Sequence, residues 1–269
     1  MSEVTEPGPS PERHLLFGLY IDGLRMDDLL ERCREALNTR RPLLLGVLNA
    51  AKLVNLRRDR TLRDSLLECD LLLADGQSVV WASRLLRRPL PERIAGIDVF
   101  EQLLGLAHRD GRSVYLLGAK PDVLAALERR IGERWPGLRI AGRQHGYYAE
   151  ADAPKVADDI RQSGADMLFI GMGSPRKEVF LGTYGASLGV PVLHGVGGSF
   201  DVLAGLTKRA PLAWQRAGFE WAYRLLQEPR RMWRRYLVTN TAFIFLTLRE
   251  AVSPTLPFAP RPNQNRQLT

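Results

Sequence analysis

Cysteine, histidine and long apolar runs are all scarce in this chain. Its 269 residues include two cysteines, Cys33 and Cys69, which we expect to be buried free thiols, and four histidines without metal-ligand spacing. No apolar run approaches the roughly 18 residues of a membrane-spanning helix. The first twelve residues are polar and proline-rich and contain no apolar signal-peptide core. We therefore expect a cytoplasmic protein without a disulfide framework, a structural metal or a membrane span.

Three nucleotide-binding and catalytic motifs are also absent. No G-x-G-x-x-G follows the first expected strand, no G-x-x-x-x-G-K-[ST] is present, and no G-x-S-x-G is present. These absences argue against a dinucleotide-binding Rossmann domain, a P-loop nucleotidase and an α/β-hydrolase.

Short apolar runs alternate with helical patterns over residues 13–206. The expected strands are 15–20, 43–48, 71–74, 113–117, 138–142, 167–171 and 190–193. This alternation predicts an α/β fold, a Rossmann-like, largely parallel sheet flanked by helices. From residue 207 to 252 the pattern is helical only, with helices expected over 212–227 and 230–252. We expect residues 1–12 and 253–269 to be disordered tails.

Polar residues follow the expected strands, where ligands bind in open parallel sheets. Asn49 and Asp75 each come directly after a strand, and Arg93 follows further on. Small residues and helix starts surround them, which suits a nucleotide diphosphate. Taken alone, Asp75 fits a turn cap as well as a catalytic carboxylate, and Arg93 fits a surface ion pair. His194 also ends a strand, and a structural role suits it better than a catalytic one.

A basic, tryptophan-rich stretch occupies residues 208–236. Between residues 207 and 250, nine Lys/Arg stand against three Glu, which gives +6 of the chain's net charge of +8. Three of the five tryptophans, Trp214, Trp221 and Trp233, lie in the same segment. Positive charge interleaved with aromatic rings suits an anionic surface, and the pattern by itself fits a bilayer or a nucleic acid.

Seven blocks occur in a fixed order along the chain. They are Asn49, A-D-G at 74–76, E-R-x-x-G-x-D at 92–98, G-S-P-R-K-E at 173–178, G-G-S-F-D-V-L-A-G at 197–205, K-R-A-P at 208–211 and E-W-x-x-R-L at 220–225. In this order and spacing the chain resembles the WecG/TagA/CpsF glycosyltransferases (glycosyltransferase family 26) over about residues 15–236. The number of matched blocks makes the resemblance specific, whereas each block alone is weak.

The resemblance implies an inverting enzyme of cell-surface or exopolysaccharide biosynthesis. Such an enzyme moves N-acetylmannosamine, glucose or a similar sugar from a UDP-sugar to a polyprenyl-diphosphate-linked saccharide. It implies no cofactor and no metal ion, and no nucleic-acid partner. A polyprenyl-linked acceptor is reached at the bilayer, so we expect peripheral association with the anionic inner face of the plasma membrane. The oligomeric state, including a homo-oligomer, is left open.

The resemblance also assigns roles to individual residues. Asp75 matches the general base that deprotonates the acceptor hydroxyl, and Arg93 matches an arginine that stabilises diphosphate charge. The expected substrate-binding residues are Asn49, Gly76, Asp98, Lys177, Glu178 and Asp201. The expected membrane or acceptor contacts are Arg209, Arg216, Arg224, Arg231, Arg234 and Arg235.

Two departures from the family pattern concern the sugar. Val47 stands where the family often has threonine, and Lys177 replaces a pocket glutamine. Loss of a hydroxyl and gain of a cation should alter sugar recognition, so we hypothesise a donor other than UDP-N-acetylmannosamine. Two other classes are weighed against this enzyme: a basic nucleic-acid-binding protein and an inactive scaffold of a polysaccharide assembly complex.

Overall fold

A parallel sheet forms the centre of the molecule. The computed structural model describes residues 12–227 and 229–259. Six strands pair in the order β4-β3-β8-β7-β5-β6, and every neighbouring pair is parallel. The strands are β3 (Leu43–Leu48), β4 (Leu71–Ala74), β5 (Ser113–Gly118), β6 (Arg139–Gln144), β7 (Met167–Gly171) and β8 (Val192–Gly195). The predicted α/β class with a largely parallel sheet is confirmed.

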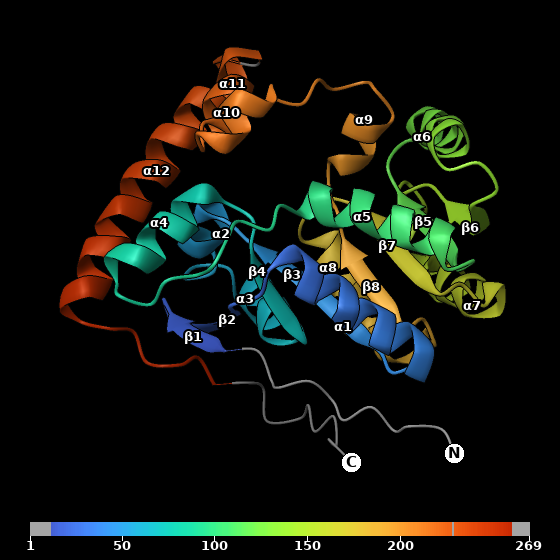
Figure 1. Ribbon diagram of the computed structural model, residues 1–269, viewed down its shortest axis with the longest axis horizontal. Helices are drawn as coiled ribbons and strands as arrows, with labels where there is room; N and C mark the ends of the chain where they lie inside the picture. Colours follow the sequence, from blue (N-terminus) through green and yellow to red (C-terminus); the bar gives the residue numbers. More distant parts are fainter. Residues whose placement is uncertain (1–11, 228, 260–269) are drawn as a thin grey trace.

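Helices cover both faces of this sheet (Figure 1). They are α1 (Met26–Thr39), α2 (Ala50–Asn55), α3 (Arg60–Leu67), α4 (Gln77–Leu85), α5 (Gly96–Arg109), α6 (Pro121–Arg134), α7 (Ala153–Ser163), α8 (Arg176–Tyr184) and α9 (Ser199–Leu203), with short 3-10 turns η1 (Glu150–Asp152) and η2 (Gly185–Ser187). Alternate strand residues serve opposite faces: Phe169 packs in the core with α1, α5 and α6, and Leu168 packs in the core with α7 and α8. Burial on both faces explains why β3, β4, β5 and β7 read as continuous apolar runs, whereas β6 at the sheet edge is partly exposed and contains polar residues.

The strand order brings distant segments together at one edge. β8 comes last in the sequence but lies between β3 and β7, so β4, β3 and β8 are adjacent. Because all three are parallel, the residues that follow them lie side by side at the carboxyl edge of the sheet. This edge is where parallel sheets place their ligands.

The N-terminal segment differs from the prediction of a single strand over 15–20. It forms an antiparallel hairpin of β1 (Arg13–Leu16) and β2 (Leu19–Asp22). Phe17 and Gly18 make the turn with φ of 57° and 85°, and two successive residues with positive φ are typical of a tight hairpin turn. Asp22 accepts hydrogen bonds from the Leu72 amide at 2.7 Å and from Arg13 Nε at 2.8 Å, which fixes the hairpin beside β4.

The C-terminal part is helical, as predicted. It contains α10 (Leu212–Arg216), α11 (Glu220–Gln227) and α12 (Pro229–Val252). The single helix expected over 212–227 is wrong, because Gly218 adopts a φ of +77° and ends the helical path there. A Cβ atom on Gly218 would lie 2.6 Å from Gln77 Cγ and 2.9 Å from the Trp81 ring. The turn between α10 and α11 therefore packs directly on α4.

Helix α12 is fastened to the α/β part at its far end. Phe243 on α12 joins a core cluster with residues of α2, α3 and the hairpin, and its ring centroid lies 5.7 Å from that of Phe17. The buried carboxylate of Glu250 accepts hydrogen bonds from the Phe17 amide at 3.1 Å and from the Thr255 hydroxyl at 2.6 Å. These contacts hold α12 alongside α2 and α4 (Figure 1).

The two predicted tails have different outcomes. Residues 253–259 follow α12 back to the hairpin, where the Phe258 amide donates to the Gly18 carbonyl oxygen at 2.9 Å. This ordered packing corrects the expectation of a disordered tail for these seven positions. Of the predicted tails, residues 1–11 and 260–269 lie outside the described residues.

Candidate active site

A cavity of about 630 Å³ lies between the carboxyl edge of the sheet and the C-terminal helices. We call the sheet side, with the segments that follow β3, β4 and β8, the floor, and we call α10, α11 and α12 the roof. The polar side chains that line the cavity come from both sides: Asn49, Asp75, Gln77, Ser78, Arg93, Ser199, Lys208, Arg209, Glu220, Tyr223, Tyr236, Thr239, Asn240 and Thr247. The predicted floor residues Asn49, Asp75, Gly76 and Arg93 are all brought together here.

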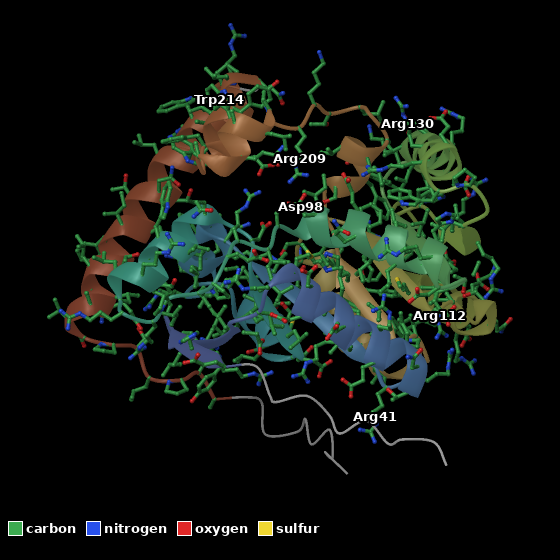
Figure 2. All side chains as sticks on the ribbon, viewed as in Figure 1. Arg41, Asp98, Arg112, Arg130, Arg209 and Trp214 are labelled. Carbon is green, nitrogen blue, oxygen red and sulfur yellow. The ribbon has the colours of Figure 1, made fainter. Side chains whose placement is uncertain are left out.

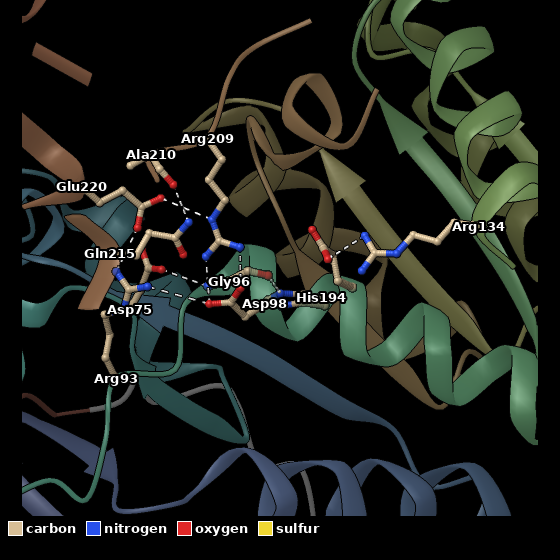
Figure 3. A network of polar contacts seen from close by, with 11 residues as sticks. Asp75, Arg93, Gly96, Asp98, Arg134, His194, Arg209, Ala210, Gln215 and Glu220 are labelled. Atoms are coloured by element: carbon tan, nitrogen blue, oxygen red, sulfur yellow. Dashed lines mark hydrogen bonds and ion pairs between the residues drawn. The ribbon is translucent and has the colours of Figure 1, made fainter. Parts of the chain in front are cut away.

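Asp75 is held at the centre of the floor by neutral donors on both carboxylate oxygens. Gly96 N donates to Oδ1 at 2.9 Å (Figure 3). Asn49 Nδ2 donates to Oδ2 at 3.4 Å. Asn49 is fixed in turn, because its Oδ1 caps α2 by accepting from Lys52 N at 3.1 Å. Each carboxylate oxygen keeps a further lone pair. The carboxylate is therefore oriented, and it can still accept a proton from a ligand in the cavity.

Gly76 lets the chain pass close to Asn49. A Cβ atom at this position would lie 3.3 Å from Asn49 Cβ, tighter than most such contacts. Gly76 also precedes the first residue of α4, so it sets where that helix begins. We conclude that Gly76 shapes the floor through its backbone.

His194 supports the floor from below. It is fully buried, and its Nε2 lies 3.1 Å from the carbonyl oxygen of Gly96. Burial lowers the pKa of His194 to about 4, so the ring is neutral near pH 7. The residue thus holds Gly96, whose amide binds Asp75, and it does not line the cavity.

Two arginines and two carboxylates alternate at the cavity where floor and roof meet (Figure 3). Arg209 makes a bidentate pair with Asp98 at 2.6 and 2.9 Å. Arg93 pairs with Glu220 at 2.9 Å, and Nη2 of Arg93 lies 3.8 Å from Asp98. Figure 2 shows Arg209 reaching from the segment after α9 toward Asp98 at the start of α5.

This arrangement, which we call the arginine–carboxylate network, balances two positive charges with two negative ones. The Arg93 and Arg209 side chains are only 14% and 20% exposed. Paired guanidinium groups bind diphosphates well, and both of these currently bind carboxylates of the protein itself. An anionic ligand could replace Glu220 or Asp98 as the partner of either arginine.

Lys177 and Glu178 lie behind the floor, in a second cavity of about 30 Å³. Lys177 Nζ lies 3.3 Å from Glu178 Oε1, and a Cβ on Gly195 would lie 2.5 Å from Lys177 Cδ. Gly195 lines both cavities, so Lys177 sits directly behind the wall of the larger one. The structure therefore places these two predicted substrate-binding residues next to the larger cavity without lining it, and their role stays a prediction.

Lys52 is a further charged group behind the floor, and sequence reasoning missed it. Its Nζ donates to the Val47 carbonyl oxygen at 2.7 Å. Burial, followed by the nearby charge of Lys177, lowers the pKa of Lys52 to about 8. Glu178 Oε2, in the same buried group, has no hydrogen-bond partner. We call Lys52, Lys177 and Glu178 the sealed charge cluster.

The remaining predicted residues fall in three places. Asp98 belongs to the arginine–carboxylate network, and Asp201 lies on α9 between Ser199 and Val202, which line the cavity although Asp201 does not. Arg209 lines the cavity, whereas Arg234 is exposed and its guanidinium carbon lies 6.0 Å from the Trp233 ring. The side chains of four predicted contacts lie outside those described: Arg216, Arg224, Arg231 and Arg235.

Several roof residues were not predicted as site residues. Tyr236, Asn240, Phe243 and Thr247 line the cavity from one face of α12. Their spacing of three and four residues is the sequence signal of a helix face. That spacing does not reveal what this face of α12 covers, because α12 lies beside segments that are far from it in the sequence.

No metal site accompanies this arrangement in residues 12–227 and 229–259. Within those ranges, no group of three His, Cys, Asp or Glu side chains is placed to hold a metal ion. The same part of the chain contains no helix long and apolar enough to cross a membrane.

The chain is similar to known glycosyltransferases over most of its length. Residues 14–256 match the family described as the glycosyl transferase WecG/TagA/CpsF family. A relative in Bacillus subtilis (strain 168), an N-acetylglucosaminyldiphosphoundecaprenol N-acetyl-beta-D-mannosaminyltransferase, is 41% identical over 180 residues. The aligned part covers 67% of this chain and 69% of that protein.

Proposed function

This chain belongs to the WecG/TagA/CpsF family and is a glycosyltransferase, and we propose that it transfers a sugar from a UDP-sugar to a saccharide carried on a polyprenyl diphosphate. The relative's name specifies an acceptor of this kind, a diphosphoundecaprenol-linked N-acetylglucosamine. The observation that carries the proposal is the position of Asp75. Its oriented carboxylate lies in a cavity that also contains two arginines able to bind diphosphates.

Asp75 acts as the general base in a single displacement. The acceptor hydroxyl oxygen forms a bond to the anomeric carbon while the bond from that carbon to the β-phosphate oxygen of UDP breaks. The hydroxyl proton passes to a carboxylate oxygen of Asp75, and UDP leaves with the electron pair. Attack from the face opposite the leaving group inverts the anomeric centre. Asn49 and the Gly96 amide keep the carboxylate directed at the hydroxyl.

Arg93 and Arg209 supply positive charge for the two diphosphates of the reaction. Charge grows on the UDP β-phosphate as the sugar departs, and a fixed guanidinium stabilises that charge without reorganising. The acceptor diphosphate brings two further phosphate groups to the same cavity. When either diphosphate binds, Arg93 or Arg209 releases its carboxylate partner and pairs with a phosphate instead.

The basic segment of α12 brings the enzyme to its lipid-linked acceptor. Arg234 and Trp233 are exposed near the start of α12, and Trp233 is 51% exposed. Each Lys or Arg near an anionic leaflet contributes about 1 kcal/mol of attraction. Flotation with liposomes that contain anionic lipid should show binding, and replacement of Arg230, Arg231, Arg234 and Arg235 by glutamine should abolish it. Equal flotation of this variant would contradict the membrane role.

The identity of the donor sugar depends on the residues that line the cavity. Val47 lines the cavity, so its lack of a hydroxyl bears directly on the space near the donor, whereas Lys177 lies behind the wall. The relative's name favours N-acetylmannosamine for that protein, and Val47 favours a different sugar for this chain. A preference for UDP-N-acetylmannosamine would overturn our expectation for the sugar without affecting the proposed reaction.

The decisive experiment is an assay with a panel of donors. UDP-N-acetylmannosamine, UDP-glucose and UDP-N-acetylglucosamine are each incubated with N-acetylglucosamine diphosphate on a short isoprenoid, and products are identified by mass spectrometry and NMR. We expect one donor to give a single new β-glycosidic bond. No transfer from any donor, combined with salt-dependent binding of duplex DNA or RNA, would instead support the nucleic-acid alternative.

A further inference from the structure

The cavity has two ends of different chemistry. One end, around Asp75 and Arg93, holds the polar groups described above. The other end lies between α4 and α12 and is lined by Thr247, whose hydroxyl donates to the Phe243 carbonyl oxygen, and by apolar side chains: Trp81, Ala82 and Leu85 from α4, and Phe243, Ile244 and Leu248 from α12. Both helices contribute lining residues at a spacing of four, Trp81 and Leu85 on α4 and Ile244 and Leu248 on α12. We call this end the apolar groove.

The apolar groove is open to solvent along its rim and closed at its base. Trp81, Leu85, Ile244 and Leu248 are 46%, 62%, 61% and 56% exposed, whereas Phe243 is only 6% exposed. Adjacent large apolar residues on a surface commonly mark a binding site. The groove is continuous with the polar end, so a ligand held there also reaches Asp75.

The occupant must be a molecule with a charged head and an apolar tail. A UDP-sugar is polar over its whole length, so it would leave the apolar groove unfilled. An acceptor in which a saccharide diphosphate joins a polyprenyl chain matches both ends of the cavity. From Asn240 to Leu248, α12 rises about 12 Å, which is enough for a few isoprene units.

We infer that the apolar groove between α4 and α12 binds the first isoprene units of the acceptor, while the diphosphate and saccharide occupy the polar end. This inference rests on the proposed function and adds which part of the protein recognises the lipid. The acceptor then enters along α4 and α12, and its diphosphate reaches Arg93 and Arg209 with the saccharide hydroxyl at Asp75. The lipid chain leaves the protein beside the exposed rim of α12.

The test compares two acceptors with one head group in a solution free of membranes and detergent. Both carry N-acetylglucosamine diphosphate, esterified with methyl in one and with farnesyl, three isoprene units, in the other. Burial of a few isoprene units predicts a kcat/KM at least about tenfold higher with the farnesyl acceptor in the wild-type enzyme. Equal values for the two acceptors would overturn the inference. Transfer to the methyl acceptor tests the proposed function separately.

A pair of matched double variants locates the effect. Ile244→Gln with Leu248→Gln alters the groove rim, and Val238→Gln with Phe245→Gln alters two residues of the same helix that are 64% and 69% exposed and do not line the cavity. In the rim variant, the ratio of kcat/KM for the farnesyl acceptor to kcat/KM for the methyl acceptor should fall most of the way to one. The control variant should keep the wild-type ratio. A rim variant that keeps the full ratio would contradict the assignment. Thermal melting checks that both variants fold.

A second measurement does not depend on catalysis. Farnesyl diphosphate that carries a photoreactive group at its terminal isoprene unit is irradiated with the wild-type protein, and the labelled peptides are sequenced by mass spectrometry. We expect labels within residues 81–85 and 243–248. Labels confined to other segments, or none, would overturn the inference even if no sugar transfer is detected.

Discussion

The floor and the roof of the cavity hold their polar groups in different ways. On the floor, Asp75 is fixed by hydrogen bonds from the Asn49 amide and the Gly96 backbone. From the roof, Glu220 reaches the floor through an ion pair with Arg93 at 2.9 Å. Hydrogen bonds from groups fixed at the starts of α2 and α5 define a geometry, whereas ion pairs at a cavity exchange for a charged ligand.

This contrast separates the groups that position the base from the groups that bind the diphosphates. The floor positions the base before any substrate arrives, because none of its contacts to Asp75 involves a group that a diphosphate would displace. The arginine–carboxylate network, where Glu220 of the roof meets Arg93 of the floor, holds the charges whose partners change when a diphosphate binds. Variants of Asp75 and of the network should therefore fail in different ways. Three predictions test this, from the largest effect on activity to the smallest, and a fourth concerns stability alone.

Asp75→Asn should have the largest effect. The variant keeps an oxygen that can accept from Gly96 but loses the base, so kcat should fall by about 10²- to 10⁴-fold. Stability should change by less than about 1 kcal/mol, because the substitution is nearly isosteric. Steady-state kinetics and urea unfolding measure the two quantities, and UDP binding by calorimetry should persist. A kcat within tenfold of the wild type would remove Asp75 as the base.

Arg93→Ala on the floor and Arg209→Ala beside the roof should each reduce kcat/KM for the donor about 10- to 100-fold. The loss corresponds to a charge-assisted hydrogen bond of about 1.5–3 kcal/mol. Arg129→Ala, at an exposed position of α6, serves as the control for removal of one positive charge. If Arg209→Ala behaved like this control, the second arginine would have no part in diphosphate binding.

The floor was the part of the site that the sequence could predict. Asn49, Asp75 and Gly76 follow β3 and β4 directly, and parallel strands end at a shared edge, so their proximity follows from the strand order. The same rule placed Lys177 and Asp201 at the correct edge but could not give their side-chain directions. Lys177 consequently points into the second cavity, behind Gly195.

The roof was not predictable to the same degree. The helix over 230–252 was expected, and the structure has it as Pro229–Val252. Its packing on α2 depends on long-range contacts such as Phe17 with Phe243, which no local pattern encodes. The hairpin turn was missed for a local reason, since Phe17 adopts a φ of 57°, which is unusual for a bulky residue.

Glu220→Gln should have a smaller effect than loss of either arginine. Removal of the carboxylate frees Arg93 from a competing partner, so we expect KM for the UDP-sugar to fall about two- to fivefold, in line with partly exposed ion pairs. The gain should shrink at 0.5 M salt, where such pairs are screened. A higher KM at both salt concentrations would mean that Glu220 binds the substrate itself rather than competing with it.

Lys52→Met tests the sealed charge cluster, whose partners no ligand replaces. Burial lowers the pKa of Lys52 to about 8 from an ordinary value of 10.5, so between these pH values the unfolded chain binds more protons than the folded one. Wild-type stability should therefore rise with pH from about 8 to 10.5. The free-energy cost of burying the charged ammonium is fully present below pH 8 and falls as Lys52 loses its proton.

The size of that cost also follows. A pKa difference of this size corresponds to about 3 kcal/mol at full burial, and we expect about 1–2 kcal/mol because Lys52 is partly exposed. Urea unfolding at pH 7, 8, 9 and 10 gives the free energy of unfolding of the wild type and of Lys52→Met. The difference between the two proteins at each pH measures this cost, because the contributions of groups that titrate in both cancel. If both proteins gain stability equally over this range, the Lys52 ammonium is not strained by burial. Burial of charge in the sealed charge cluster would then cost no measurable stability.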